Sequence, residues 1–222
     1  MKLFLTSAGL SNDTIIAGLE KLSGKTLAGQ KLAFIPTAAN VESGDKQWMI
    51  KDLNNCLKAG FEVDIVDISA VEKDIWLPRL QAADVLLFGG GSTAHLMHWM
   101  EKSGLQELLP ELLKNKIYIG ISAGSCVTGP TISNPVQDLF GESYPLEITE
   151  GLGFTDFHFI PHLNSEYFTQ IRTENLAQAA QHVTGSVYAL DDNSALALDD
   201  DLHKILSEGN WEKFEGTSVA QQ

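Results

Sequence analysis

The sequence has little of several features that would place a protein in a special class. Its two cysteines, Cys56 and Cys126, lie within apolar helical patterns, so it has no disulfide framework and suits a reducing compartment. No apolar run approaches the length of roughly 18 residues that a membrane-spanning helix needs. The 15 basic residues are outnumbered by 29 acidic ones, which gives a formal charge of −14. This charge argues against nucleic acid or an anionic membrane surface as a partner.

What is present is typical of a globular protein. A chain of 222 residues, of which 44% are hydrophobic, is long enough for one domain with a full core. The apolar start, residues 1–5, is interrupted by the small residues 6–9 too early for a signal peptide. We therefore expect residues 1–222 to form a single cytoplasmic domain.

Strands alternate with helices through the first half of the chain. The helical patterns lie between short apolar runs, with Ser11 as N-cap of the first helix and Gly60 closing the second. This alternation predicts an α/β fold with a doubly wound, mostly parallel sheet flanked by helices. Ligand sites in such sheets lie beyond the C-terminal ends of the strands. The predicted strands are 2–6, 31–35, 61–66, 84–88 and 117–121.

The last of these strands runs into a G-x-S-x-G motif, Gly120-Ile121-Ser122-Ala123-Gly124. In a nucleophile elbow the serine lies on a tight strand-to-helix turn, between glycines that allow close passage of neighbouring backbone. The turn exposes the serine Oγ atom and leaves the Ala123 amide free at a helix N-terminus, where it can stabilise an oxyanion. The alternative is a glycine-rich turn without chemistry.

The second half of the chain is less regular. We expect a short strand at 131–133, a long loop at 134–150, a strand at 157–160 that stops at Pro161, and a helix over 165–181. Three further strands, 187–190, 195–198 and 203–206, are expected to form a C-terminal hairpin region with an acidic turn at 199–201. We expect residues 215–222 to be frayed.

A serine nucleophile needs a base, and His162 is the best candidate among the six histidines. It follows Pro161 at a predicted strand end, where a capping role is the alternative. His95 and His98 lack a third ligand at a suitable spacing, so no metal site is expected. His158 alternates with phenylalanines in a strand and is expected to be packed in the core, whereas His182 and His203 are expected at the surface.

Three glycines, Gly89-Gly90-Gly91, follow the strand at 84–88. They lack the lysine of a P-loop and do not match G-x-G-x-x-G, so they do not indicate a phosphate cradle. They can supply a backbone amide to an oxyanion hole, as the glycine loops of lipases do. A tight turn without further role is the other interpretation.

Four segments in this order and spacing resemble peptidase E, a family of aspartyl dipeptidases related to cyanophycinase. They are Gly89–Thr93, Gly120–Gly124, Pro130–Ile132 and Pro161–His162. The resemblance covers nearly the whole chain and implies a flavodoxin-like fold similar to class I glutamine amidotransferases, with serine in place of their elbow cysteine. It implies Ser122 as nucleophile, His162 as base, and the amides of Gly90 and Ala123 as the oxyanion hole. We also expect Gly89, Gly91 and Ser133 to line the substrate pocket.

The sequence departs from the family at two points. Ser92 replaces the asparagine that usually follows the three glycines. The third catalytic residue is open between two positions. Bacterial peptidase E carries an aspartate in the loop after P-T-I, where this chain has Gln137 and then Asp138. Cyanophycinase-like members use an acid in a late segment matched by residues 189–196, with Asp192 in its place, and we favour Asp192.

The leading functional hypothesis is a serine peptidase of the dipeptidase type that hydrolyses short peptides through an acyl-enzyme. An esterase or amidase acting on a small non-peptide substrate, and a non-catalytic small-molecule-binding domain of the same fold, are the alternatives. We expect no cofactor, no nucleic acid and no membrane as partner, and leave a homodimer open. The chain has two arginines, Arg79 and Arg172, neither within the pocket segments. A substrate carboxylate needs a cation to receive it, so we expect weak or no preference for aspartyl dipeptides.

Overall fold

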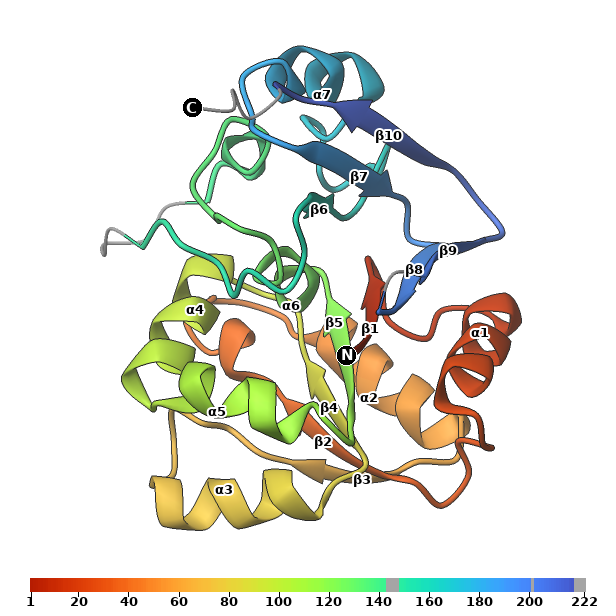
Figure 1. The fold of residues 1–222 in the computed structure, drawn as a ribbon, viewed down its shortest axis with the longest axis vertical. Coiled ribbons are helices and arrows are strands. Elements are labelled where there is room, and N and C mark those ends of the chain that lie inside the picture. The colour runs from red at the N-terminus through yellow and green to blue at the C-terminus, as the bar shows by residue number, and fades with distance from the viewer. Residues whose placement is uncertain (143–147, 201, 218–222) are drawn as a thin grey trace.

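A seven-stranded sheet dominates the computed structural model, among the residues that the structure describes, which are 1–142, 148–200 and 202–217. The strand order is β3-β2-β4-β5-β1-β8-β9 (Figure 1). The first five strands in this order are parallel, β8 runs antiparallel to β1, and β9 runs antiparallel to β8. The strands are β1 (Lys2–Thr6), β2 (Lys31–Ile35), β3 (Glu62–Ile65), β4 (Val85–Phe88), β5 (Ile117–Ile121), β8 (Ser194–Asp199) and β9 (Leu202–Ser207).

Helices cover both faces of this sheet, because its central strands are apolar on both sides. Successive residues point to opposite faces: Leu3 and Leu5 pack with α3, α4 and α5, whereas Phe4 packs with α1 and α2. This architecture confirms the predicted doubly wound α/β fold. The helices are α1 (Asp13–Ser23), α2 (Gln47–Lys58), α3 (Lys73–Ala82), α4 (Thr93–Lys102), α5 (Leu105–Leu112) and α6 (Ala123–Cys126), with a short 3₁₀ turn η1 at Thr37–Ala39.

A second, smaller sheet lies beyond the C-terminal ends of β1 and β5 (Figure 1). Among the described residues it has three strands in the order β10-β7-β6, with β6 parallel and β10 antiparallel to β7. Together with one helix it encloses a separate apolar cluster that includes Ile160, Leu176 and Val187. Its elements are β6 (His158–Ile160), α7 (Thr173–Ala180), β7 (Ser186–Leu190) and β10 (Trp211–Glu215), and a 3₁₀ turn η2 spans Asp138–Phe140.

The helix predicted over 165–181 is wrong in its first half, because α7 begins only at Thr173. Asn164 has a positive φ of 61°, and its amide donates to the carbonyl of Ile171 at 2.9 Å. The chain therefore closes a loop over 164–171 before it enters the helix. Arg172, the residue before α7, is extended, with φ −126° and ψ 148°. This loop carries the chain back over His162.

The prediction of one C-terminal hairpin region is wrong for its first strand. β7 belongs to the small sheet, and only β8 and β9 form a hairpin in the large one. The chain crosses between sheets at 191–193, where the Asp191 carboxylate accepts hydrogen bonds from the Asn193 amide and the Ser194 hydroxyl. Asp201 of the acidic turn lies outside the described residues.

Smaller corrections concern element ends. Asn12 caps α1 by accepting from the Ile15 amide at 2.9 Å, in place of Ser11. The predicted strand at 131–133 is a single bridge between Thr131 and Glu150. Glu215, the first residue of the tail predicted to fray, ends a strand. Residues 218–222 of this tail and residues 143–147 of the 134–150 loop lie outside the described part. Within the described ranges, no helix has the length and apolar character needed to cross a membrane.

Candidate active site

The G-x-S-x-G motif forms a strained turn between β5 and α6. Ser122 has φ 50° and ψ −109°, a backbone conformation that a non-glycine residue holds only when its surroundings enforce it. Its amide donates to the Thr6 carbonyl at 3.0 Å. A Cβ atom on Gly124 would lie 2.0 Å from the Phe88 carbonyl oxygen, and one on Gly120 would lie 2.6 Å from the Gly124 carbonyl oxygen. Both glycines are therefore required for the close backbone approach at this turn.

Tyr118 supports the turn from within the sheet. Its hydroxyl donates to the Gly124 carbonyl at 2.6 Å, and its ring stacks on Phe88 with centroids 4.7 Å apart. Cys126, at the end of α6, is buried, and burial raises the pKa of its thiol to about 12. Since the thiolate is the reactive form, Cys126 is inert at neutral pH, and Ser122 is the nucleophile candidate of this turn.

His162 faces Ser122 from the end of β6, as the sequence predicted for a residue after Pro161. Its Nε2 atom lies 3.0 Å from Ser122 Oγ, and its φ is 64°. Its amide donates to Ser7 Oγ at 3.2 Å, and Ser7 Oγ donates to the Leu190 carbonyl at 2.8 Å. The loop after β1 thus ties the end of β6 to the end of β7.

Asp192 completes a hydrogen-bonded chain with these two residues. Its Oδ1 atom lies 2.6 Å from His162 Nδ1. A carboxylate only accepts hydrogen bonds, so Nδ1 donates and Nε2 is left to accept from the Ser122 hydroxyl. The Asp192 carbonyl is held by the Ser11 hydroxyl at 2.8 Å. Asp138, the other candidate, is exposed in η2. The acceptor for His162 Nδ1 is Asp192, which takes the role that Asp138 would have.

Two backbone amides are free to act as an oxyanion hole. Within the described ranges, no acceptor is bonded to the amide of Gly90 or of Ala123. A Cβ atom on Gly90 would lie 3.4 Å from Ser122 Cβ, which places the glycine loop directly beside the elbow. Gly91 has φ 128° and passes so close to Ala38 that a side chain would collide with its carbonyl. The loop is therefore fixed against the turn that follows β2.

The three residues predicted to line the substrate pocket lie in two different loops. Gly89 and Gly91 lie in the loop that passes the elbow. Ser133 is exposed, and its amide donates to the Thr131 hydroxyl at 3.1 Å. No hydrogen bond joins Ser133 to the Ser122–His162–Asp192 chain in the described part of the protein.

Carboxyl groups gather around the glycine loop. Glu142 accepts hydrogen bonds from the Ser92 hydroxyl and the Ala94 amide at the start of α4. Burial, together with the neighbouring Glu142 charge, raises the pKa of Glu42. Asp52, on α2, is 7% exposed, and burial, with a smaller contribution from Asp192, raises the pKa of its carboxyl to about 7. A lysine accompanies each of these two acids: the charge of Lys46 lowers the pKa of Glu42 and that of Lys51 lowers the pKa of Asp52, each against the stronger effect of burial.

Both arginines are engaged by other groups. The Arg79 guanidinium pairs with Asp64 and also donates to the Ile65 carbonyl, on the β3 edge of the sheet. Arg172 Nη1 donates to the carbonyls of Phe168 and Ile171 at 3.0 Å each.

The remaining histidines are not joined to this chain of hydrogen bonds. His158 is buried, with Asn134 and Thr184 as polar neighbours. His95 and His98 lie with their ring edges toward Trp99. Among the described residues, no group of three or more histidine, cysteine, aspartate or glutamate side chains is arranged to hold a metal ion.

Sequence reasoning missed Ser7, Asp52 and Phe168. The Phe168 ring stacks on the His162 imidazole with centroids 4.4 Å apart and an interplanar angle of 10°. A signal for Phe168 exists, since Tyr167 and Phe168 are two aromatic residues in an otherwise polar stretch. No signal exists for Ser7 or Asp52, because an ordinary serine in a loop and an ordinary aspartate on a helix gain their roles only from what packs against them.

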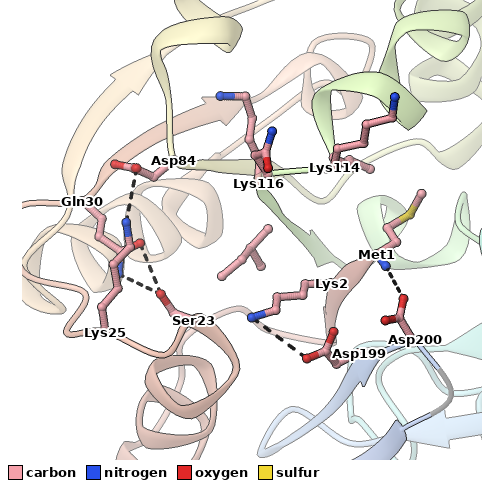
Figure 2. A pocket seen from close by; sticks show the side chains of 13 residues that line it. Met1, Lys2, Ser23, Lys25, Gln30, Asp84, Lys114, Lys116, Asp199 and Asp200 are labelled. Carbon is pink, nitrogen blue, oxygen red and sulfur yellow. Dashed lines mark hydrogen bonds and ion pairs between the residues drawn. The ribbon is translucent and has the colours of Figure 1, made fainter.

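A hollow at the opposite edge of the sheet is unrelated to this site. It has a volume of about 350 Å³ and lies at the N-terminal ends of β1 and β5. Three of its cations have acidic partners: Lys25 pairs with Asp84, Lys2 lies 4.0 Å from Asp199, and the N-terminal amine bonds Asp200 (Figure 2). Lys116, which also lines the hollow, donates to the backbone carbonyls of Gln81 and Ala83.

The chain is similar to several known proteins. The profile of peptidase family S51 matches residues 3–206. An uncharacterized peptidase of Listeria monocytogenes is 27% identical over 200 residues, covering 88% of this chain and 93% of that protein. Peptidase E of Haemophilus influenzae is 28% identical over 193 residues, covering 81% of this chain and 76% of that protein. A solved structure from Listeria monocytogenes covers 94% of this chain and 98% of its own, with a TM-score of 0.79 and 24% identity. That structure bears on the fold alone.

Proposed function

This chain belongs to peptidase family S51 and is a serine peptidase, and from that premise we propose that it hydrolyses short peptides with Ser122 as nucleophile, His162 as base and Asp192 as orienting acid. One observation carries the proposal. Ser122 Oγ and His162 Nε2 lie 3.0 Å apart, and His162 Nδ1 and Asp192 Oδ1 lie 2.6 Å apart. Both distances are within hydrogen-bond reach, as nucleophile, base and orienting group require.

In the first step Ser122 Oγ attacks the carbonyl carbon of the scissile bond while its proton passes to His162 Nε2. Negative charge develops on the carbonyl oxygen, which the amides of Gly90 and Ala123 receive. Asp192 stabilises the imidazolium and keeps its Nδ1 proton in place. The tetrahedral intermediate collapses when His162 returns the proton to the leaving amine, so the C-terminal product departs with a neutral amino group.

The second step frees the enzyme. The N-terminal part of the substrate remains as an ester on Ser122, and a water molecule enters the place of the leaving amine. His162 removes a proton from this water, whose oxygen attacks the ester carbonyl. The second tetrahedral intermediate breaks its bond to Ser122 Oγ, which recovers its proton from His162.

The charges around the site argue against selectivity for peptides with an N-terminal aspartate. Glu142 bonds the residues that follow the glycine loop, and its charge acts on Glu42. The field of these carboxyl groups opposes a further carboxylate at the loop. Arg172 has one terminal nitrogen committed to backbone carbonyls. Desolvating a substrate carboxylate costs several kcal/mol unless a fixed cation receives it.

A panel of Asp-Ala, Asn-Ala and Ala-Ala, with product release followed by mass spectrometry, tests this proposal. We expect hydrolysis of all three, with kcat/KM values within about tenfold of one another, which corresponds to roughly 1.4 kcal/mol. Labelling by a fluorophosphonate probe, absent in Ser122→Ala, separates a peptidase from a binding domain. A strong preference for Asp-Ala would overturn the selectivity proposal, and Arg172→Ala would then be made to find the receiving cation.

A further inference from the structure

The aromatic ring of Phe168 covers one face of the His162 imidazole and is itself partly open. The rings are nearly parallel, with centroids 4.4 Å apart. The His162 side chain is 13% exposed, whereas Phe168 is 36% exposed. A large apolar surface thus remains accessible directly beside the base. Burying apolar surface of this kind under a ligand is favourable.

The ring is held in place by the loop between β6 and α7. The Phe168 carbonyl accepts from Arg172 Nη1 and from the Ile171 amide, each at 3.0 Å. Phe140, from η2, meets the ring edge-on with centroids 5.7 Å apart. Because both the backbone and the ring edge are fixed, the open surface is a preformed part of the site.

The reaction decides which part of a substrate meets this surface. His162 Nε2 must hand its proton to the leaving nitrogen, so that nitrogen lies about 3 Å from Nε2 at the moment of transfer. The next backbone atom is the Cα of the residue that follows the scissile bond. A side chain on this Cα starts within two bonds of the leaving nitrogen, beside the imidazole and hence beside the ring stacked on it.

We propose that Phe168, with Phe140 behind it, forms the subsite for the residue immediately after the scissile bond, and that this subsite selects apolar side chains. The proposal rests on the proposed peptidase function and adds a substrate class to it.

Turnover of Ala-Gly, Ala-Leu and Ala-Phe by the intact protein is the first measurement. We expect kcat/KM for Ala-Leu and Ala-Phe to exceed that for Ala-Gly by roughly tenfold or more, the discrimination that an apolar pocket provides. In Phe168→Ala this ratio should fall toward one, mainly through KM for the apolar substrates. Phe168→Leu should keep part of it, and the matched control Tyr167→Ala, which alters a neighbouring aromatic residue that is 83% exposed, should keep all of it.

Binding to inactive protein separates failure of the subsite from failure of the chemistry. Calorimetry with Ser122→Ala should show tighter binding of Ala-Phe than of Ala-Gly, and Ser122→Ala/Phe168→Ala should lose the difference. If the protein hydrolyses dipeptides without an apolar preference, the subsite is overturned and the peptidase function stands. If Phe168→Ala lowers kcat equally for every substrate and displaces the pH profile, the ring only positions the imidazole and the proposal is wrong. If no dipeptide is hydrolysed but the binding difference persists, the subsite stands and the proposed function fails.

Discussion

Ser125 and Thr6 exchange two hydrogen bonds where β5 passes into the elbow. Ser125 Oγ donates to the Thr6 carbonyl at 2.9 Å and accepts from the Thr6 amide at 3.0 Å. Both residues are fully buried. Ser125, the second serine of the elbow, thus bonds the backbone amide and carbonyl of Thr6 at the end of β1, whereas Ser122 faces His162. Two serines three positions apart have separate tasks, one structural and one proposed to be chemical.

This separation predicts opposite phenotypes for two alanine variants. Ser122→Ala should fold normally and lose turnover by several orders of magnitude, because it removes the proposed nucleophile. Ser125→Ala should retain the reaction but lose roughly 1–3 kcal/mol of stability, because the buried Thr6 amide loses the Ser125 hydroxyl as its acceptor. The Thr6 carbonyl keeps its bond from the Ser122 amide. Peptide turnover and urea denaturation of both proteins provide the comparison. Full activity in Ser122→Ala, with contamination excluded, would move the nucleophile elsewhere.

Asp192 and Asp138 offer a second matched pair. Asp192→Asn should lower kcat by about 10⁴, the cost of losing the orienting carboxylate in the serine-protease case. Asp138→Asn should leave kcat within about threefold of the starting protein, because Asp138 is exposed and is not bonded to His162. Steady-state kinetics on one dipeptide are sufficient. The reverse pattern would assign the orienting role to Asp138.

Asp52 should make stability depend on pH. Its carboxyl has a pKa of about 7 in the folded protein, against 3.8 ordinarily. The folded state therefore holds a proton that the unfolded state releases, and the stabilisation present below pH 3.8 is lost as the pH rises to 7. The full loss is about 4 kcal/mol at 1.36 kcal/mol per pKa unit.

We expect Asp52→Asn to be more stable than the starting protein at pH 8, with a gain that shrinks as the pH falls toward 4. Denaturant unfolding at several pH values measures this difference. Asp138→Asn is the matched control and should show no such trend, since its side chain is exposed. A gain from Asp52→Asn that is the same at pH 8 and pH 5 would mean that Asp52 is already ionised at pH 5 in the folded protein, so that its pKa is not raised.

Gly124 should tolerate no side chain. A Cβ atom there would lie 2.0 Å from the Phe88 carbonyl oxygen, so Gly124→Ala should cost at least 1–3 kcal/mol through forced backbone movement. Gly29→Ala is the control: the site has φ 78° with no atom within 4 Å, so its cost is backbone strain of about 1 kcal/mol. Thermal unfolding should rank the two accordingly, and equal losses would contradict the close approach.

The sequence by itself determined the fold and the positions of the elbow and of His162, the proposed base. Apolar strands alternating with amphipathic helices leave few topologies open, and the G-x-S-x-G turn and Pro161–His162 are local patterns that follow directly from residue type. Local patterns of this kind depend on few distant contacts. That Ser122 and His162 meet depends on how the two sheets are placed, because β5 lies in the large sheet and β6 in the small one.

Only the tertiary structure decided which aspartate faces His162, where the helix after it begins, and what surrounds the elbow. Asp138 and Asp192 both follow turns, and the choice depends on β7 lying in the small sheet, which directs residues 191–193 toward His162. Residues 165–172 have helical composition, yet the Asn164–Ile171 hydrogen bond closes them into a loop that carries Phe168 over the imidazole. These features arise from contacts between residues far apart in the chain, which residue order and local propensity do not specify.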